Sequence, residues 1–246
     1  LAGQCVGEGI VVDVSKHYTQ VLAFDEINKT ITVEPGVIRD ELNLFLKPFG
    51  LFFGPNTSTS NRCMIGGMVG NNSSGSTSIK YGVTRDKVLQ IDGFLSDGTS
   101  VIFNELTSEE FKTKLKEDSL EGKIYKSLYN ELSQKEVQLE IKNQFPKPSI
   151  HRRNTGYAVD ELLDSDLFGG KNNKINVAKL LSGSEGTLVF STKITLQLDT
   201  IQPKESVIVA SHFKSINESL KATVLAMNHD LYACELMDKV ILDCTK

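Results

Sequence analysis

The sequence predicts an α+β fold, in which strands and helices occupy separate stretches of the chain. Short runs of β-branched and apolar residues dominate 20–34, charged residues at helical spacing fill 107–142, and apolar residues alternate over 187–198. Strands are therefore followed by helices and then by a further strand. This order differs from the regular strand–helix alternation of a doubly wound sheet, so we expect an α+β architecture.

The first hundred residues predict several strands and one helix. Strands are expected over 10–14, 20–24, 30–34, 88–95 and 100–103. Residues 20–34 read as a hairpin that turns near Asn28. Ile38, Leu42 and Leu46 recur at helical spacing, which predicts a helix over 37–47 that Pro48 ends.

The second half predicts charged surface helices, one long strand and a new unit. Helices are expected over 107–116, 122–142 and 159–163, and a half-buried strand over 187–198. Pro203 marks an expected domain boundary, so we predict one domain over 1–202 and the beginning of another over 203–246. In the second, a strand over 206–210, a helix over 216–227 and a strand over 231–236 are expected.

Composition excludes several classes of function. The chain has 246 residues, a net charge of −4 and 39% hydrophobic residues, and this acidic balance argues against a general nucleic-acid binder. No apolar run approaches the roughly 20 residues that span a bilayer, and no secretory signal is visible. The four cysteines and four histidines form neither Cys-x-x-Cys nor His-x-x-x-His, so no metal site is predicted and the thiols fit a cytoplasmic protein. Because the chain opens with Leu1 and ends within an apolar-periodic stretch, we expect it to belong to a longer protein.

The segment 64–86 is the most informative part of the sequence. It contains five glycines and a run of Asn and Ser side chains, which together could cradle a phosphate or the edge of a flat polar ring. A flexible surface loop is the alternative. Met64, Ile65 and Met68 interleave with the glycines and favour burial, and a buried glycine-rich backbone needs partners for its polar groups.

Two further stretches are candidates for binding. Residues 181–188 place Gly183 and Gly186 in a turn that feeds the long strand, although an ordinary strand-entry turn is an equal alternative. Arg152 and Arg153 stand beside Asn, Gly and Tyr157 and could grip a carboxylate or a phosphate; the alternative is a solvated charge pair before a helix. Standard dinucleotide, P-loop and nucleophile-elbow motifs are missing from the sequence.

Taken in order, these motifs resemble those of the FAD-linked oxidase family. The stretches that carry the resemblance are 33–37 (VEPGV), 54–58 (GPNTS), 65–75 (IGGMVGNNSSG), 80–86 (KYGVTRD), 96–98 (SDG), 153–157 (RNTGY) and 183–188 (GSEGTL). The family shares the flavin-binding fold of vanillyl-alcohol oxidase and p-cresol methylhydroxylase (PCMH type). The chain is most similar to its glycolate oxidase and D-lactate dehydrogenase branch, and residues 51–75 resemble bacterial members fused to an iron–sulfur module.

The resemblance implies a fold and a cofactor. The fold is an FAD-binding PCMH-type domain, here mainly its second subdomain, followed by the start of a ferredoxin-like substrate cap. The cofactor is FAD, with no metal in this chain. The residues implied to bind it are Gly3, Gln4, Pro55, Thr57, Ser58, Gly66, Gly67, Asn71, Asn72, Gly75, Gly82, Thr84, Asp86, Gly186, Thr187 and Leu188.

The same resemblance implies oxidation of a 2-hydroxy acid, such as D-lactate, glycolate or D-2-hydroxyglutarate, to the 2-oxo acid by hydride transfer to flavin N5. Arg152, Arg153 and Tyr157 would bind the substrate, and the catalytic base would lie in a cap region beyond this chain. Electrons would leave through an iron–sulfur module, fused or separate, and the full-length protein could associate peripherally with a membrane. Alternatives are a flavoprotein oxidase acting on another alcohol or a lactone, and a non-catalytic chain that no longer binds FAD.

One departure from the family pattern concerns cofactor retention. The family's main pyrophosphate loop is a glycine-rich run that ends in Leu-Ala-Gly-Gln, and only this ending is present, as residues 1–4. We therefore expect the 246-residue chain alone to be inactive and to retain no flavin. Stoichiometric flavin that co-purifies with it would contradict this expectation.

Overall fold

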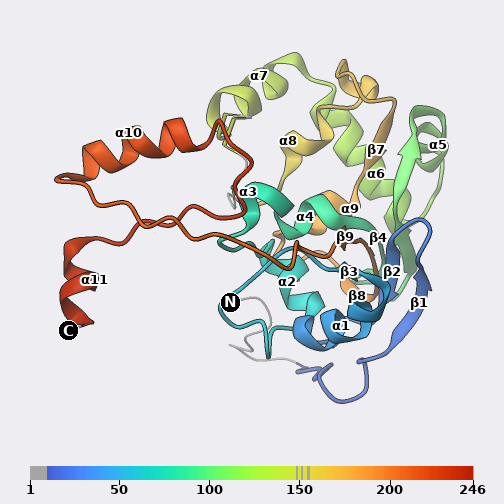
Figure 1. The fold of residues 1–246 in the computed structure, drawn as a ribbon. Helices are drawn as coiled ribbons and strands as arrows, with labels where there is room; N and C mark the ends of the chain where they lie inside the picture. The colour runs from blue at the N-terminus through green and yellow to red at the C-terminus, as the bar shows by residue number, and fades with distance from the viewer. Residues whose placement is uncertain (1–9, 148, 151, 154–155, 246) are drawn as a thin grey trace.

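The computed structural model describes residues 10–147, 149–150, 152–153 and 156–245. A five-stranded antiparallel sheet forms its centre, in the order β1-β2-β8-β4-β5. The strands are β1 (Val21–Asp25), β2 (Thr30–Val33), β8 (Phe190–Gln197), β4 (Val88–Phe94) and β5 (Ser100–Phe103). The predicted hairpin and the long late strand are confirmed, and β8 lies between two strands of the N-terminal half (Figure 1).

Short helices and a strand pair follow the hairpin and cover the sheet near β8. They are α1 (Arg39–Leu46), η1 (Lys47–Phe49), β3 (Leu51–Phe52), α2 (Ile65–Asn71), α3 (Ser78–Tyr81), α4 (Thr84–Lys87) and β9 (Asp199–Thr200). The helix predicted over 37–47 is confirmed as α1, with Leu42 and Leu46 buried. Strand β3 pairs with β9, and α2 contacts β8. The glycine-rich segment therefore sits against the middle of the sheet.

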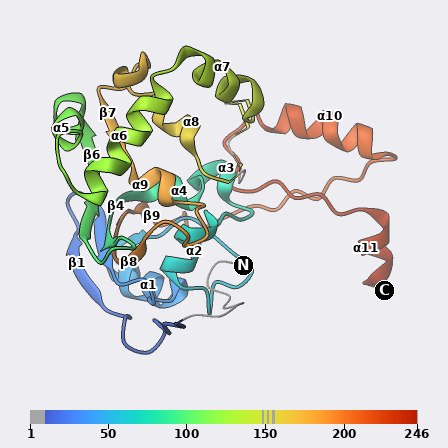
Figure 2. The same cartoon turned by 180° about the vertical axis from the view of Figure 1, so that it is seen from behind.

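A second group of helices lies beside β5 and β4 (Figure 2). Its elements are β6 (Glu105–Thr107), α5 (Ser108–Lys114), α6 (Leu120–Leu132), α7 (Lys135–Gln144), α8 (Val159–Leu162), η2 (Asp166–Phe168), β7 (Lys174–Asn176) and α9 (Ala178–Leu181). The predicted helix over 122–142 is two helices, because the chain turns at Ser133 and Gln134. Helix α9 packs on β4 and leads into the second glycine motif.

Beyond β9 the chain forms an arm that projects from the body and carries α10 (Ile216–Ala226) and α11 (Lys239–Cys244) (Figure 1). The predicted helix over 216–227 is confirmed. The strands predicted over 206–210 and 231–236 are wrong: these segments hold no assigned strand, and Val207, Ile208 and Val209 are between 80% and 93% exposed. Extended β-branched residues there meet no sheet edge. The predicted domain boundary at Pro203 stays a prediction.

Two other predicted elements differ from the structure. Residues 10–14 form no strand, because they lie outside the sheet, with Ile10 94% exposed. Residues 65–71, for which no helix was predicted, form the helix α2. In the described part of the chain, every helix is too short or too polar to cross a membrane.

Candidate functional site

Helix α2 presents the first glycine motif. Ile65, Met68 and Val69 are buried, which makes the glycine-rich segment an amphipathic helix instead of a loop. Its first N–H groups are satisfied within the chain, since Ile65 donates to the carbonyl oxygen of Val37 at 2.9 Å and Gly66 to that of Pro35 at 2.8 Å. A Cβ on Gly66 would come within 2.6 Å of the Pro35 Cβ, whereas one on Gly67 would meet no atom within 4 Å. Gly67, unlike Gly66, thus has open space in front of its α-carbon.

The second glycine motif docks on the C-terminal end of α2. The Gly183 N–H donates to the carbonyl oxygen of Val69 at 2.9 Å, and the Glu185 N–H to that of Gly70 at 2.8 Å. The bond from Glu185 gives the helix-terminal carbonyl of Gly70 a partner, and the bond from Gly183 adds a second donor to the Val69 oxygen, which also accepts from the Asn72 N–H at 3.0 Å. Gly183, Glu185 and Gly186 all have positive φ, so the turn is held in a conformation that L side chains rarely adopt. Positive φ is also common at turn glycines, so this geometry fits both a binding turn and an ordinary strand-entry turn.

A cavity of about 30 Å³ lies between the two motifs. Its lining residues are Gly66, Val69, Gly70, Leu181, Ser184, Gly186, Val189 and Ser191. Beside it, Gly186, Thr187 and Leu188 are exposed, and the Tyr157 hydroxyl is 2.8 Å from the Thr187 hydroxyl. The structure therefore brings together two predicted binding stretches that are more than a hundred residues apart in the sequence.

Arg85 fastens these stretches and was missed by sequence reasoning. Its side chain is buried, and Nη2 donates to the carbonyl oxygen of Ser182 at 2.6 Å while Nε donates to the same oxygen at 3.1 Å. Burial lowers the pKa of Arg85, although the guanidinium stays charged at any ordinary pH. The sequence signal was its place between Thr84 and Asp86, two predicted binding residues, but nothing in the sequence shows that it points inward.

Asn72 is the predicted binding residue whose structural role differs most from expectation. It caps α2 with a φ of 49° and is completely buried. Its Oδ1 accepts from the Arg85 N–H at 2.8 Å and its Nδ2 donates to the Arg153 carbonyl oxygen at 3.4 Å. Asn72 thus links the end of α2 to Arg85 and Arg153, and its contact with flavin stays a prediction.

Several other predicted residues also have partners within the chain. Thr84 is buried and donates through Oγ1 to the Ser73 carbonyl oxygen at 2.7 Å. Asp86 accepts from the Val83 N–H at 2.9 Å, and a Cβ on Gly82 would overlap the Asp86 carboxylate. Asn71 is half-buried and donates to the Ser73 hydroxyl at 3.1 Å. These contacts give the conformation of 71–86 an explanation that needs no ligand.

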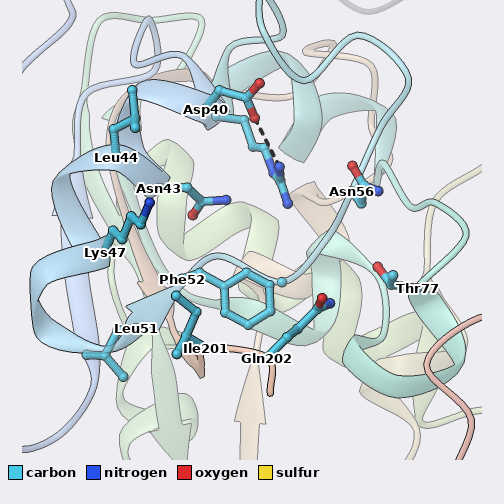
Figure 3. A pocket seen from close by; sticks show the side chains of 12 residues that line it. Asp40, Asn43, Leu44, Lys47, Leu51, Phe52, Asn56, Thr77, Ile201 and Gln202 are labelled. Carbon is cyan, nitrogen blue, oxygen red and sulfur yellow. Dashed lines mark hydrogen bonds and ion pairs between the residues drawn. The ribbon is translucent and has the colours of Figure 1, made fainter. Parts of the chain in front are cut away.

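The segment 54–58 lies beside the start of α1. Pro55 is buried and its carbonyl oxygen accepts from Arg39 Nε at 3.1 Å. Thr57 is half-buried with its hydroxyl 3.2 Å from Cys63 Sγ, and Ser58 is exposed. An open groove of about 580 Å³ runs along this side (Figure 3), and Asn56 and Phe52 point toward it. Arg39 and Asn43 in its wall already bond to the backbone of 53–55, so their polar groups serve the fold.

Two of the predicted substrate residues contact the two glycine motifs: the Arg153 carbonyl oxygen accepts from Asn72 Nδ2 at 3.4 Å, and the Tyr157 hydroxyl lies 2.8 Å from that of Thr187. Arg153 pairs with Asp160 and with Glu161, so two carboxylates balance its charge. Its pKa is raised above the usual arginine value, because the bonds and charges of Asp160 and Glu161 together outweigh burial, the largest single effect, which lowers it. Arg152 is exposed, as is Tyr157. Binding of a substrate carboxylate by these residues stays a prediction.

An extended flavin needs bare backbone that it can approach closely. Gly67 and Gly186 meet this requirement, since a Cβ on either would find no atom within 4 Å, and the exposed residues Thr187 and Leu188 directly follow Gly186. The small cavity is far too small for a flavin ring, so the exposed backbone and not the cavity is what fits the cofactor. Gly66 and Gly75 are instead packed against the chain itself. The predicted residues Gly3 and Gln4 lie outside the described residues.

Comparison with known proteins adds independent findings. Residues 1–104 match a family model described as an FAD binding domain. The chain is 33% identical over 99% of its length to D-2-hydroxyglutarate dehydrogenase of Escherichia coli (strain K12), covering 23% of that protein, so it spans about a quarter of such relatives. It is 42% identical over 39% of its length to glycolate oxidase subunit GlcD of Bacillus subtilis (strain 168), covering 20% of it. Among solved structures, an alkyldihydroxyacetonephosphate synthase aligns with a TM-score of 0.43 and 17% identity over 75% of this chain and 22% of that one.

Proposed function

We propose that this chain belongs to the FAD-linked oxidase family and is the flavin-binding part of a 2-hydroxy-acid dehydrogenase, a proposal supported by the match of residues 1–104 to an FAD binding domain. The observation that carries the proposal is the docking of the 183–186 turn on α2, the helix that contains Gly67, which places Gly186 beside Gly66 and Gly70 of that helix. The exposed residues 187–188 follow directly after Gly186. Bound FAD would supply the hydride acceptor.

The residues of this chain would bind and orient the cofactor. The backbone at Gly67, Gly186 and Thr187 would face it, and the bonds from Gly183 and Glu185 to α2 would keep that backbone fixed. A fixed backbone matters because hydride transfer depends on how accurately the two reacting atoms are held. Arg152, Arg153 and Tyr157 would contribute to binding the substrate carboxylate.

D-2-hydroxyglutarate is the substrate that the relatives favour. Several relatives named D-2-hydroxyglutarate dehydrogenase are 31–33% identical over 98–99% of this chain. A glycolate oxidase subunit and a yeast D-lactate dehydrogenase match over only 39% of this chain, and an Arabidopsis thaliana D-lactate dehydrogenase matches over 94% of it at a lower identity of 25%. We further propose that electrons leave through an iron–sulfur module, fused or separate. The cytoplasmic location stays a prediction.

The test is an anaerobic titration of the complete protein followed by visible absorption. We expect the flavin band near ~450 nm to bleach with D-2-hydroxyglutarate and to bleach more slowly with D-lactate or glycolate. If only D-lactate or only glycolate bleaches the band, that compound is the substrate instead, and the proposed reaction class still holds. A protein that binds FAD and is bleached by none of the three would contradict the proposed activity.

The 246-residue chain provides a second measurement. Because the chain covers only 23% of a relative such as the Escherichia coli protein, we expect this chain alone to purify with less flavin than a protein of the relatives' full length. The flavin-to-protein absorbance ratio of the two preparations decides this. Equal ratios would show that residues 1–246 suffice for binding.

A further inference from the structure

We propose that Arg85 is a positioning residue of the flavin site, which sets the distance between the two glycine motifs without touching the cofactor. The inference rests on the proposed function and goes beyond it, because it assigns the geometry of the site to a buried side chain. Arg85 is only 3% exposed.

The first step of the argument is the direction of the Arg85 side chain. It crosses from α4 to the end of α9, where Nη2 and Nε bond to the Ser182 carbonyl oxygen and Nε also lies 3.2 Å from the Lys179 carbonyl oxygen. A planar guanidinium holds its donors in a fixed fork, whereas the three donors of a lysine ammonium rotate about one nitrogen and fix two carbonyls less firmly. The residue held, Ser182, comes directly before the turn at Gly183.

The second step is the other end of Arg85. Its backbone N–H donates to Asn72 Oδ1 at 2.8 Å, and Asn72 is the residue that ends α2. The same residue therefore bonds to the end of the first motif through its backbone and to the start of the second through its side chain. A displacement of Arg85 would shift one motif relative to the other.

The third step is the space that the turn leaves for the guanidinium. A Cβ on Gly183 would lie 2.8 Å from Arg85 Nη2 and 3.5 Å from the Asn72 Cβ. Gly183 also has a φ of 98°, a value that residues other than glycine avoid. The glycine thus admits Arg85 while its own N–H bonds to Val69, so the turn, the arginine and α2 interlock.

The test compares Arg85→Lys with Leu132→Ala in the complete protein. Lysine keeps the charge but loses the fork, whereas Leu132 is a buried residue at the end of α6 whose truncation lowers stability away from the site. For Arg85→Lys we expect FAD affinity to fall about tenfold or more and amide exchange of 183–187 in the flavin-free protein to accelerate. For Leu132→Ala we expect a lower unfolding midpoint with both of these quantities unchanged.

Each outcome separates the inference from the proposed function. Wild-type protein that binds FAD, together with Arg85→Lys that binds it equally and shows unchanged exchange, would overturn the inference alone. If FAD affinity falls in both variants in proportion to their loss of folding stability, Arg85 acts only through stability, and the inference is again overturned. Wild-type protein that binds no FAD would overturn both. If Arg85→Lys does not fold, Gly183→Ala, which keeps the arginine and displaces its head group, must show the same two effects.

Discussion

The α-carbon of Gly75 lies directly against the backbone of Asn56, so that a Cβ built on Gly75 would overlap the Asn56 carbonyl oxygen and lie 2.8 Å from its carbonyl carbon. The obstacle is backbone and cannot rotate away. This contact joins the end of the first glycine motif to the segment beside Pro55, and it shows that one glycine of the motif is required by the chain itself.

Replacement of Gly75 by alanine should therefore destabilise the protein by about 1–3 kcal/mol, the usual range for overpacking. Gly67→Ala is the matched control: it adds the same methyl group into open space within a helix, where alanine is favoured over glycine by roughly 0.5–1 kcal/mol. Urea unfolding of the two variants should give shifts of opposite sign. Shifts of the same sign would contradict this packing.

Replacement of Glu185 by asparagine should stabilise the flavin-free protein by a few tenths to about 1 kcal/mol. Glu185 is exposed and has a φ of 55°, a region that asparagine tolerates better than glutamate. Thermal unfolding measures the change, with Glu185→Ala as the control because alanine gains nothing at positive φ. A midpoint for Glu185→Asn no higher than that of Glu185→Ala would contradict the prediction.

Replacement of Tyr125 by phenylalanine should leave stability unchanged or raise it by up to about 1 kcal/mol at neutral pH. The Tyr125 ring is fully buried against Phe111, and among the described residues its hydroxyl has no hydrogen-bond partner. A buried hydroxyl without a partner costs desolvation free energy that nothing returns. Urea unfolding at pH 7 checks this, and a loss above about 2 kcal/mol would show that the hydroxyl has a partner after all.

Tyr125 also predicts a pH dependence. Burial raises its pKa far above the ordinary tyrosine value of 10.0, so the unfolded chain loses this proton first as the pH rises. The stability contributed by the protonated group is complete below pH 10 and falls as the pH rises above it. Tyr125→Phe should therefore flatten the loss of stability above pH 10 that urea unfolding measures in the wild type.

Replacement of Asp230 by asparagine should loosen the C-terminal arm from the body. Lys80 Nζ lies 2.6 and 2.7 Å from the Asp230 carboxylate oxygens and 5.2 Å from the centre of the Tyr232 ring. Amide exchange of 229–238 should accelerate in Asp230→Asn and, in the wild type, with added salt, because exposed pairs are screened. Glu235→Gln, on the same arm, should change neither.

The bond to Asp230 raises the pKa of Lys80 above the ordinary value of 10.5. The contribution of the pair to docking of the arm is therefore complete below pH 10.5 and is lost as the pH rises through the raised pKa. Exchange of 229–238 in the wild type should stay constant between pH 6 and 9 once corrected for intrinsic rates. A change within that window would point to another titrating group.

The elements that sequence reasoning predicted correctly are those with a clear period and a local partner. The hairpin of β1 and β2, helix α1 and strand β8 each carry their periodicity within one short stretch. Helix α2 was missed because its glycines argue against a helix, yet Ile65, Met68 and Val69 stood at helical spacing. Packing of those three side chains outweighed the low helix propensity of glycine.

The sequence predicted which stretches belong to the candidate site but not what each residue in them contacts. The two glycine motifs do meet, but the sequence does not show which glycines face open space, as Gly67 does, and which face the chain, as Gly75 does. That difference depends on contacts between residues distant in sequence. The same holds for Arg85, whose side chain points inward because it bonds to the carbonyl oxygen of the distant Ser182. The strands predicted at 206–210 and 231–236 failed for a related reason, because a strand needs an edge to pair with.

The position of β8 has a consequence for how the chain folds during synthesis. The 104-residue stretch that matches the FAD binding domain contains β1, β2, β4 and β5, but β2 and β4 share no edge until β8 enters between them, and paired Thr32 and Thr195 are 163 residues apart. During synthesis, the β1–β2 pair and the β4–β5 pair therefore emerge with open edges long before β8, the strand that joins them. Closing the long loop between β2 and β8 costs entropy, so the complete sheet should form late, and the nascent protein should depend on chaperones until β8 has emerged.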